Sequence, residues 1–254
     1  MSKYLPSGRG FYIWRLPKCE NGDIGKIIDR CQECNISWLA IKCGDQGGEW
    51  SQFTPELVKQ LKDAGISVGG WSYDTPGDDS HLQKQADVYL RAVQDGAQFV
   101  LLDTEVEFEC KNADDYAKRY CDKVKDSLLM YPDVSIGYAP IDVISFHQAF
   151  PYTVFSEACD WTSPQAYWAT HGISEVSSTK RYLEQWTSFE AHNSMVKKPR
   201  AAGGTCYGSS TAAEMLHFER TLQLAGEIGC LYWSWQQAGP EIWSGLSGKA
   251  FGEV

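Results

Sequence analysis

Eight short apolar runs recur along the chain, and a longer polar or amphipathic stretch follows most of them. The runs cover residues 10–14, 38–43, 67–73, 99–105, 134–140, 161–168, 200–206 and 229–235. Runs of this length, bounded by turn residues, predict strands. The intervening stretches predict helices over 25–34, 55–64, 80–94, 114–130, 141–150, 177–191 and 212–228. Strands that alternate with helices indicate right-handed βαβ units and a parallel sheet.

Cap residues support these boundaries. Thr54 followed by Pro55 is typical of a helix start, and Gly65 and Gly96 follow predicted helix ends. Eight strands in 254 residues, with no second composition zone, predict a single (β/α)8 TIM barrel over residues 1–254. A doubly wound open sheet is the alternative, but no glycine-rich dinucleotide or phosphate loop follows any predicted strand.

The fourth run, FVLLDTEVEFE at residues 99–109, turns from apolar to acidic. On a continuous strand, Asp103, Glu105 and Glu107 would share one face. Like charges stacked on one face of a strand destabilise it. Carboxylates at the C-terminal end of a barrel strand indicate a catalytic role. We therefore predict that Asp103 and Glu105 are catalytic, with Glu107 as a further candidate. The alternative is that the strand stops at Asp103 and the later acids are solvated, which we expect for Glu109.

The other predicted strand ends converge on the same pocket and carry aromatic and amide side chains. Such groups hold sugar rings, while a carboxylic acid can protonate the leaving oxygen of a glycosidic bond. These strand ends contain no Ser-His-Asp order and no His cluster, and we expect His147 and His171 to be loop residues. Trp14, Trp38 and Trp233 are expected in the core or wall. The residues predicted to bind substrate are Trp71, Tyr73, Asp74, Tyr138, Gln165, Tyr167, Trp168, Trp235 and Gln236.

The charge and cysteine content narrow the range of partners. The net charge is −10 and no basic run is present, so we expect no nucleic acid partner. The nine cysteines are an odd number, and Cys31 and Cys34 lack a second pair or a His at zinc spacing. We therefore expect reduced thiols, no metal and no cofactor.

The N-terminal sequence MSKYLPSGRGFYIW has no long apolar run behind its positive charges. No segment of the sequence approaches membrane-spanning length. We expect no signal peptide, no membrane partner and synthesis for the cytoplasm. Release by lysis, or carriage on a phage particle, would then bring the protein to a cell wall.

The sequence resembles two glycosidase families. Leu-Leu-Asp103-Thr-Glu105 resembles the D-x-E of the family 25 lysozymes, and Gln165-Ala-Tyr167 is similar to their strand-six Q-Y. This resemblance implies that Glu105 is the proton donor and that Asp103 is the stabilising carboxylate. The chain departs from that family because its first strand carries no Asp, and Trp233-Ser-Trp replaces the strand-eight Asp.

The acidic run also resembles the D-x-D-x-E motif of the family 18 chitinases. This resemblance implies that Glu107 is the donor, with Glu105 where that family has its middle Asp, and a Trp ends the eighth strand. The prediction is a lysozyme-like or endolysin-like glycoside hydrolase of an N-acetylated glycan, with peptidoglycan as first candidate. A chitinase-like hydrolase with Glu107 as acid is one alternative. Another is a non-catalytic carbohydrate-binding barrel or a structural component of a larger assembly, and the oligomeric state stays open.

Overall fold

Eight parallel strands form the wall of a barrel in the computed structural model, which describes residues 3–195 and 197–253. They are β1 (Gly8–Ile13), β2 (Ile36–Asp45), β4 (Ser67–Asp74), β5 (Phe99–Thr104), β6 (Ser135–Tyr138), β7 (Trp161–Thr162), β8 (Ala201–Thr205) and β9 (Gly229–Trp233). Hydrogen-bonded neighbours follow the order β7, β6, β5, β4, β2, β1, β9, β8. Isolated bridges from Thr162 to Arg200 and from Gln165 to Gly203 join the two ends of this sheet. The predicted (β/α)8 TIM barrel is therefore confirmed.

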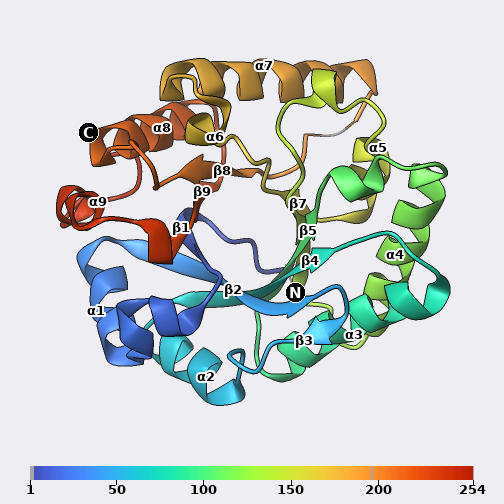
Figure 1. The fold of residues 1–254 in the computed structure, drawn as a ribbon, viewed down its shortest axis with the longest axis horizontal. Coiled ribbons are helices and arrows are strands. Elements are labelled where there is room, and N and C mark those ends of the chain that lie inside the picture. The colour runs from blue at the N-terminus through green and yellow to red at the C-terminus, as the bar shows by residue number, and fades with distance from the viewer. Residues whose placement is uncertain (1–2, 196, 254) are drawn as a thin grey trace.

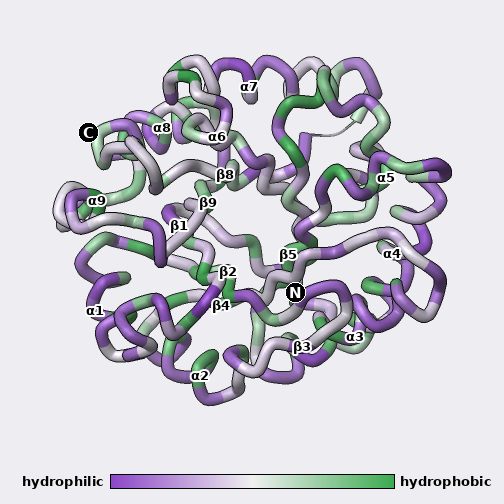
Figure 2. Tube along the Cα trace, in the orientation of Figure 1, coloured by the Kyte–Doolittle hydropathy of each residue, from purple (hydrophilic) through white to green (hydrophobic). Residues whose placement is uncertain are grey.

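Helices form a ring around the strands (Figure 1), and hydrophilic residues predominate along this ring (Figure 2). The α-helices are α1 (Ile24–Glu33), α2 (Pro55–Asp63), α3 (Asp79–Gln94), α4 (Ala113–Ser127), α5 (Tyr152–Ala158), α6 (Trp168–His171), α7 (Glu175–His192), α8 (Ala212–Leu224) and α9 (Pro240–Leu246). Short 3-10 turns are η1 (Leu16–Lys18), η2 (Glu20–Gly22), η3 (Val106–Phe108), η4 (Ile144–Phe146) and η5 (Trp235–Gln237). A two-residue strand, β3 (Gly48–Glu49), pairs antiparallel with the end of β2.

Six of the seven predicted helices are present within a few residues of their expected ends. The helix predicted over 141–150 is wrong, since that segment is a loop containing only η4. The buried carboxylate of Asp142 accepts hydrogen bonds from Arg181 at 3.1 Å and from His171 at 3.3 Å, and these contacts hold the segment to the following elements. The α5 helix, which the pattern did not predict, starts just after Pro151.

The strand predicted over 161–168 is also wrong beyond Thr162. Pro164 lacks an N–H group, so pairing beyond Thr162 is reduced to isolated bridges of Gln165 with Ile141 and Gly203. The backbone instead turns locally, with the Ala166 amide donating to Pro164 and the Tyr167 amide donating to Gln165. Trp168 then begins α6. This irregular segment, rather than a strand, delivers Gln165 and Tyr167 to the end of the barrel.

Large aromatic rings fill the lower interior of the barrel, and each lies over a glycine of the neighbouring strand. In the strand register Gly10 pairs with Trp38, Gly69 with Phe99, and Gly137 with Trp161. A Cβ atom on any of these glycines would lie 2.2–2.3 Å from a ring carbon. The three rings also contact one another edge to face, with centroids 5.5–6.0 Å apart. The interior is thus a packed core and not a pore.

Two buried ion pairs tie the N-terminal ends of the strands to the rest of the molecule. Arg9 of β1 donates to both carboxylate oxygens of Glu219 on α8, at 2.6 and 2.7 Å. Arg200 donates to Glu227 at 2.6–3.0 Å, and both side chains are buried. These pairs lie at the barrel end that normally supports stability rather than catalysis.

All nine cysteines lie within the described residues, where they are free thiols, and eight of them are buried. Within that same part of the chain, no helix combines the length and the apolar character needed to cross a lipid bilayer.

Candidate active site

Two carboxyl groups meet at the C-terminal end of β5. Asp103 lies near the end of this strand, and Glu105 follows it by two residues at the start of η3, one residue beyond the end of the strand. The side-chain nitrogen of Gln165 donates to Asp103 Oδ1 at 3.2 Å and to Glu105 Oε1 at 3.1 Å. The same nitrogen lies 3.1 Å from the carbonyl oxygen of Ala139. One amide group therefore holds the two carboxyls side by side.

The carboxyl pair lines a cavity of about 240 Å³ at this end of the barrel. The lining residues are Tyr12, Asp103, Glu105, Gln165, Tyr167, Thr170, Tyr207 and Trp233. Thr170 and Tyr207 share a hydrogen bond between their hydroxyl groups, which links the loops after β7 and β8. The cavity thus combines two acids and one amide with aromatic rings and hydroxyl groups, a composition that suits a sugar ring.

Burial raises the pKa of Asp103 well above its usual value. The carboxyl groups of Glu105 and Asp74 raise the pKa of Asp103 further, whereas Lys42 lowers it. Burial also raises the pKa of Glu105, against a hydrogen bond from Gln165 that favours the ionised form. Because two close, desolvated carboxyls do not both ionise readily, the state with one shared proton is favoured.

Tyrosine hydroxyls face the same pair. Burial raises the pKa of Tyr12, and the charges of Asp103 and Glu105 raise it further. Burial likewise raises the pKa of Tyr167, with Tyr12 and Asp103 as additional causes. Both phenols therefore remain protonated at neutral pH and are available to donate hydrogen bonds.

Glu107 lies outside this cavity lining. It is exposed on η3 and faces the hydroxyl of Tyr73, whose pKa is raised by burial and then by Glu107. The predicted alternation of three acids on one face stops at Glu105 because the strand ends at Thr104. Glu109 was expected to be solvated, but it is partly buried and pairs with His147.

Several residues predicted to bind substrate point away from the cavity, so the prediction is wrong for Tyr138, Trp168 and Trp235. Tyr138 stacks on Phe155 of α5 in the layer between strands and helices. Trp168 packs against Phe218 of α8, with ring centroids 5.3 Å apart. Trp235 is buried in the same outer layer, where it contacts aromatic rings of β1 and α9.

Asp74, Trp71 and Gln236 also lie outside the lining. Asp74 is fully buried on the outer face of β4, where it accepts a hydrogen bond from Tyr89 at 2.5 Å. Trp71 is buried in the barrel interior, where it packs against two residues of the cavity lining, Tyr12 and Trp233. Gln236 accepts a hydrogen bond from the backbone of Trp14 at 3.3 Å, and so joins the loops after β1 and β9. Of the predicted binding residues, Gln165 and Tyr167 line the cavity, and Tyr73 lies beside it.

The residues predicted to bind substrate did not include Tyr12, Thr170, Tyr207 or Trp233, although Tyr12, Tyr207 and Trp233 lie at predicted strand ends that converge on the pocket. The sequence could have identified Tyr12, because side chains alternate between the two faces of a strand and Tyr12 therefore shares the inward face of Gly10. Trp233 was expected in the core or wall, and its ring borders the cavity and packs on Tyr12 with centroids 5.2 Å apart. Thr170 lies in α6, where the pattern predicted no helix.

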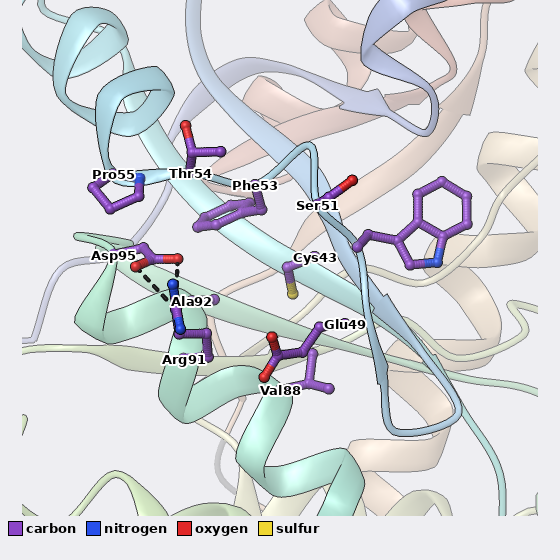
Figure 3. Close-up of a pocket in the computed structure, with 11 residues that line it drawn as sticks. Cys43, Glu49, Ser51, Phe53, Thr54, Pro55, Val88, Arg91, Ala92 and Asp95 are labelled. Atoms are coloured by element: carbon purple, nitrogen blue, oxygen red, sulfur yellow. Dashed lines mark hydrogen bonds and ion pairs between the residues drawn. The ribbon is translucent and has the colours of Figure 1, made fainter.

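A second hollow of about 280 Å³ lies on the outer side of β2, against α2 and α3 (Figure 3). Cys43 lies at its base, and Arg91 and Asp95 of α3 form an ion pair on its wall. This hollow is separate from the carboxyl pair because Cys43 points outward from β2, whereas Asp103 lines the cavity at the end of the barrel. Within the described residues, no group of three or more His, Cys, Asp or Glu side chains is arranged to hold a metal ion.

Comparison with known proteins places this fold among glycosidase barrels. No family profile matches the chain, and no curated protein sequence matches it. The C-terminal domain of a putative chitinase from Desulfitobacterium hafniense DCB-2 is similar in structure, with a TM-score of 0.70 and 9% identity over 95% of this chain and 97% of that chain. The Bacillus cereus spore cortex-lytic enzyme SleL has a TM-score of 0.63 and 13% identity, covering 96% of this chain and 76% of its own.

A family 18 chitinase from Pseudoalteromonas aurantia gives a TM-score of 0.63 and 14% identity, over 93% of this chain and 97% of that chain. At such low identities the likeness establishes the fold alone. The chain therefore has the (β/α)8 fold seen in these glycoside hydrolases, including family 18 chitinases. The resemblance to family 25 lysozymes stays a prediction.

Proposed function

We propose that the protein is a glycoside hydrolase that cleaves a glycan of N-acetylated sugars, with the peptidoglycan backbone as first candidate. The observation that carries this proposal is the Asp103–Glu105 pair, joined by Gln165 in a cavity with aromatic walls. A carboxyl whose pKa is raised can hold a proton near neutrality and deliver it to a leaving oxygen. The structurally similar proteins are named as chitinases and a spore cortex-lytic enzyme, which is in keeping with such a substrate.

The lining of the cavity favours a mechanism in which the substrate supplies the nucleophile. Both carboxyls of the described lining come from the end of β5, and the remaining lining side chains carry amide, phenol, hydroxyl or indole groups. Mechanisms that use two carboxylates need one on each side of the scissile bond. Substrate-assisted glycosidases use the oxygen of the sugar's own acetamido group instead.

In this mechanism Glu105 is the acid and Asp103 is the positioning carboxylate. The acetamido N–H donates to Asp103, which favours its ionised form and leaves the shared proton on Glu105. Glu105 protonates the glycosidic oxygen as the bond from C1 breaks, and the acetamido oxygen bonds to C1. Water then attacks C1 as the bond between C1 and the acetamido oxygen breaks, and it gives a proton back to Glu105, which restores the acetamido group and the resting pair. Tyr12 and Tyr167 donate hydrogen bonds to substrate oxygens.

The test is release of reducing ends from purified peptidoglycan and from chitin. Loss of a general acid lowers the rate roughly 10²- to 10⁴-fold, so Glu105→Gln should abolish most activity. Glu107→Gln is the matched control, since it removes an exposed acid of the same turn, and it should retain activity within about a few fold. Deacetylated chitin should not be cleaved if the acetamido group is the nucleophile.

The proposal has two clear ways to fail. Loss of activity only in Glu107→Gln would move the acid to that residue, as the chitinase-like alternative requires. A wild-type protein that releases nothing from a broad panel of N-acetylated glycans would contradict the enzyme proposal. Calorimetric binding to the same glycans would then test the carbohydrate-binding alternative.

A further inference from the structure

Lys42 is a buried cation at the active-site end of the barrel that the proposed mechanism does not yet use. It lies on β2 and is only 4% exposed. Its ammonium group lies 4.7 Å from the ring centre of Trp50 and 4.8 Å from that of Trp71. Asp45 accepts a hydrogen bond from it at 2.5 Å. A buried lysine is costly unless it is paired, and here two indole faces and one carboxylate offset that cost.

The position of Lys42 relates it to the catalytic pair. Trp71, which carries one face of the ammonium site, packs edge to face on Tyr12 and Trp233, with centroids 5.4 and 5.6 Å apart. Those two rings line the cavity. Trp71 therefore contacts both the ammonium group of Lys42 and two rings of the cavity lining.

The strand register makes a second connection. Asp45 of β2 pairs with Tyr73 of β4, and Tyr73 pairs with Asp103 of β5. The counter-ion of Lys42 and the buried catalytic carboxyl thus occupy the same cross-strand row. Neighbouring strands lie about 4.8 Å apart, so this row places the backbones of Asp45 and Asp103 about 10 Å from one another.

We propose that Lys42 is a positioning residue of the active site, whose charge offsets the Asp103–Glu105 pair and determines the pH range in which that pair holds a single proton. Asp45 moderates this effect because it neutralises part of the charge on Lys42. The inference rests on the proposed function for its kinetic consequence, although the ionisation of the pair is measurable without a substrate.

Several ionisable groups surround Asp103. They come from each element packed around it: Lys42 and Asp45 on β2, Tyr73 and Asp74 on β4, Glu105 and Glu107 after β5, Tyr12 on β1 and Tyr167 after β7. The carboxyls in this set oppose ionisation of Asp103, and the phenols are neutral. Lys42 favours ionisation, so its removal has a predictable direction.

The experiment compares Lys42→Met with Asp45→Asn, because the two changes have opposite signs. A unit charge about 10 Å away in a protein interior moves a titration by roughly one pH unit. Lys42→Met should raise both titration steps of the carboxyl pair by about that amount, and Asp45→Asn should lower them. The readout is ¹³C-carboxyl NMR of labelled Asp and Glu, together with the pH profile of kcat/KM on the cleaved glycan.

Two further variants are controls. Lys42→Arg keeps the charge and should restore the wild-type pH profile. Lys59→Met removes an exposed lysine that is paired with Asp63 on α2, and should leave the profile unchanged. A purely structural role would lower activity or stability in both Lys42→Met and Asp45→Asn, but would not move their titrations in opposite directions.

The inference is overturned if the titration of the pair stays within about 0.2 pH units of wild type in folded Lys42→Met. If Lys42→Met does not fold, the decision falls to Asp45→Asn, where an unchanged or upward shift refutes the inference. The NMR result stands even if the wild type cleaves no glycan, so failure of the proposed function and failure of this inference remain distinguishable.

Discussion

Asp74 is a buried acid whose ionisation should make the protein less stable as the pH rises. Its side chain is fully buried between β4 and the helices α3 and α4. Tyr89 donates to one carboxylate oxygen, and the other oxygen has no hydrogen-bond partner among the described residues. Burial raises the pKa of Asp74 from 3.8 to about 7, and the nearby hydroxyl groups of Tyr120 and Tyr89 lower it in part. Asp74→Asn keeps the shape of the protonated acid and removes the titration.

The magnitude follows from linkage between protonation and folding. Between pH 3.8 and about 7 the folded protein binds a proton that the unfolded chain has lost. Stability from this group is therefore complete below the unfolded pKa and is lost as the pH rises to the folded pKa. At 1.36 kcal/mol per pKa unit the whole loss is roughly 4 kcal/mol, of which roughly 2.5 kcal/mol falls between pH 5 and pH 8. Asp74→Asn should gain that amount relative to wild type over this range.

The assay is urea unfolding at constant ionic strength at pH 5, 6, 7 and 8, followed by tryptophan fluorescence. The quantity of interest is the difference in unfolding free energy between Asp74→Asn and wild type, because other titrating groups cancel in it. Asp87→Asn, an exposed acid on α3, is the control and should give the same difference at every pH. A difference for Asp74→Asn that stays constant within about 0.5 kcal/mol, or that moves against the mutant as the pH rises, would refute the reasoning.

Three other changes test separate parts of the structure. Gln165→Leu removes the amide that joins the two carboxyls, and should lower kcat roughly 10²-fold, with circular dichroism to verify the fold. Gly69→Ala places a methyl group 2.2 Å from the ring of Phe99, and should lower the unfolding free energy by about 1–3 kcal/mol in urea. Arg9→Met leaves Glu219 buried without its partner, and should cost about 3–5 kcal/mol in the same assay.

The sequence predicted the barrel well because apolar runs and cap residues report directly on burial and on helix ends. It failed where one residue type overrode the pattern. Inside one apolar run, β7 ends at Thr162, two residues before Pro164. Asp142 holds another apolar segment as a loop through partners that are distant in sequence. The spacing of apolar residues along the sequence was the evidence for these elements, and neither the end of β7 nor the loop at Asp142 depends on that spacing.

The site was harder to predict because side-chain direction changes with every residue of a strand. Tyr138 follows the inward-facing Gly137 and therefore points outward, although it ends a strand at the active-site end. The side chain of Asp103 was correctly predicted to point into the pocket, because its strand is unbroken and its carboxyl needs polar partners. The bridging role of Gln165 depends on the irregular segment after β7, whose path no local pattern predicts.

The packing of the interior explains why the cavity with the carboxyl pair lies at one end of the barrel. Trp38, Phe99 and Trp161 fill the lower interior, and they fit because glycines face them across the strands. The next layer upward contains Tyr12 and Trp71, so the interior offers no space for substrate below Asp103. The carboxyl pair is therefore reached from the C-terminal end of the barrel, where Lys42 lowers the pKa of Asp103. The same aromatic filling that stabilises the barrel thus keeps the pair desolvated and able to hold a proton.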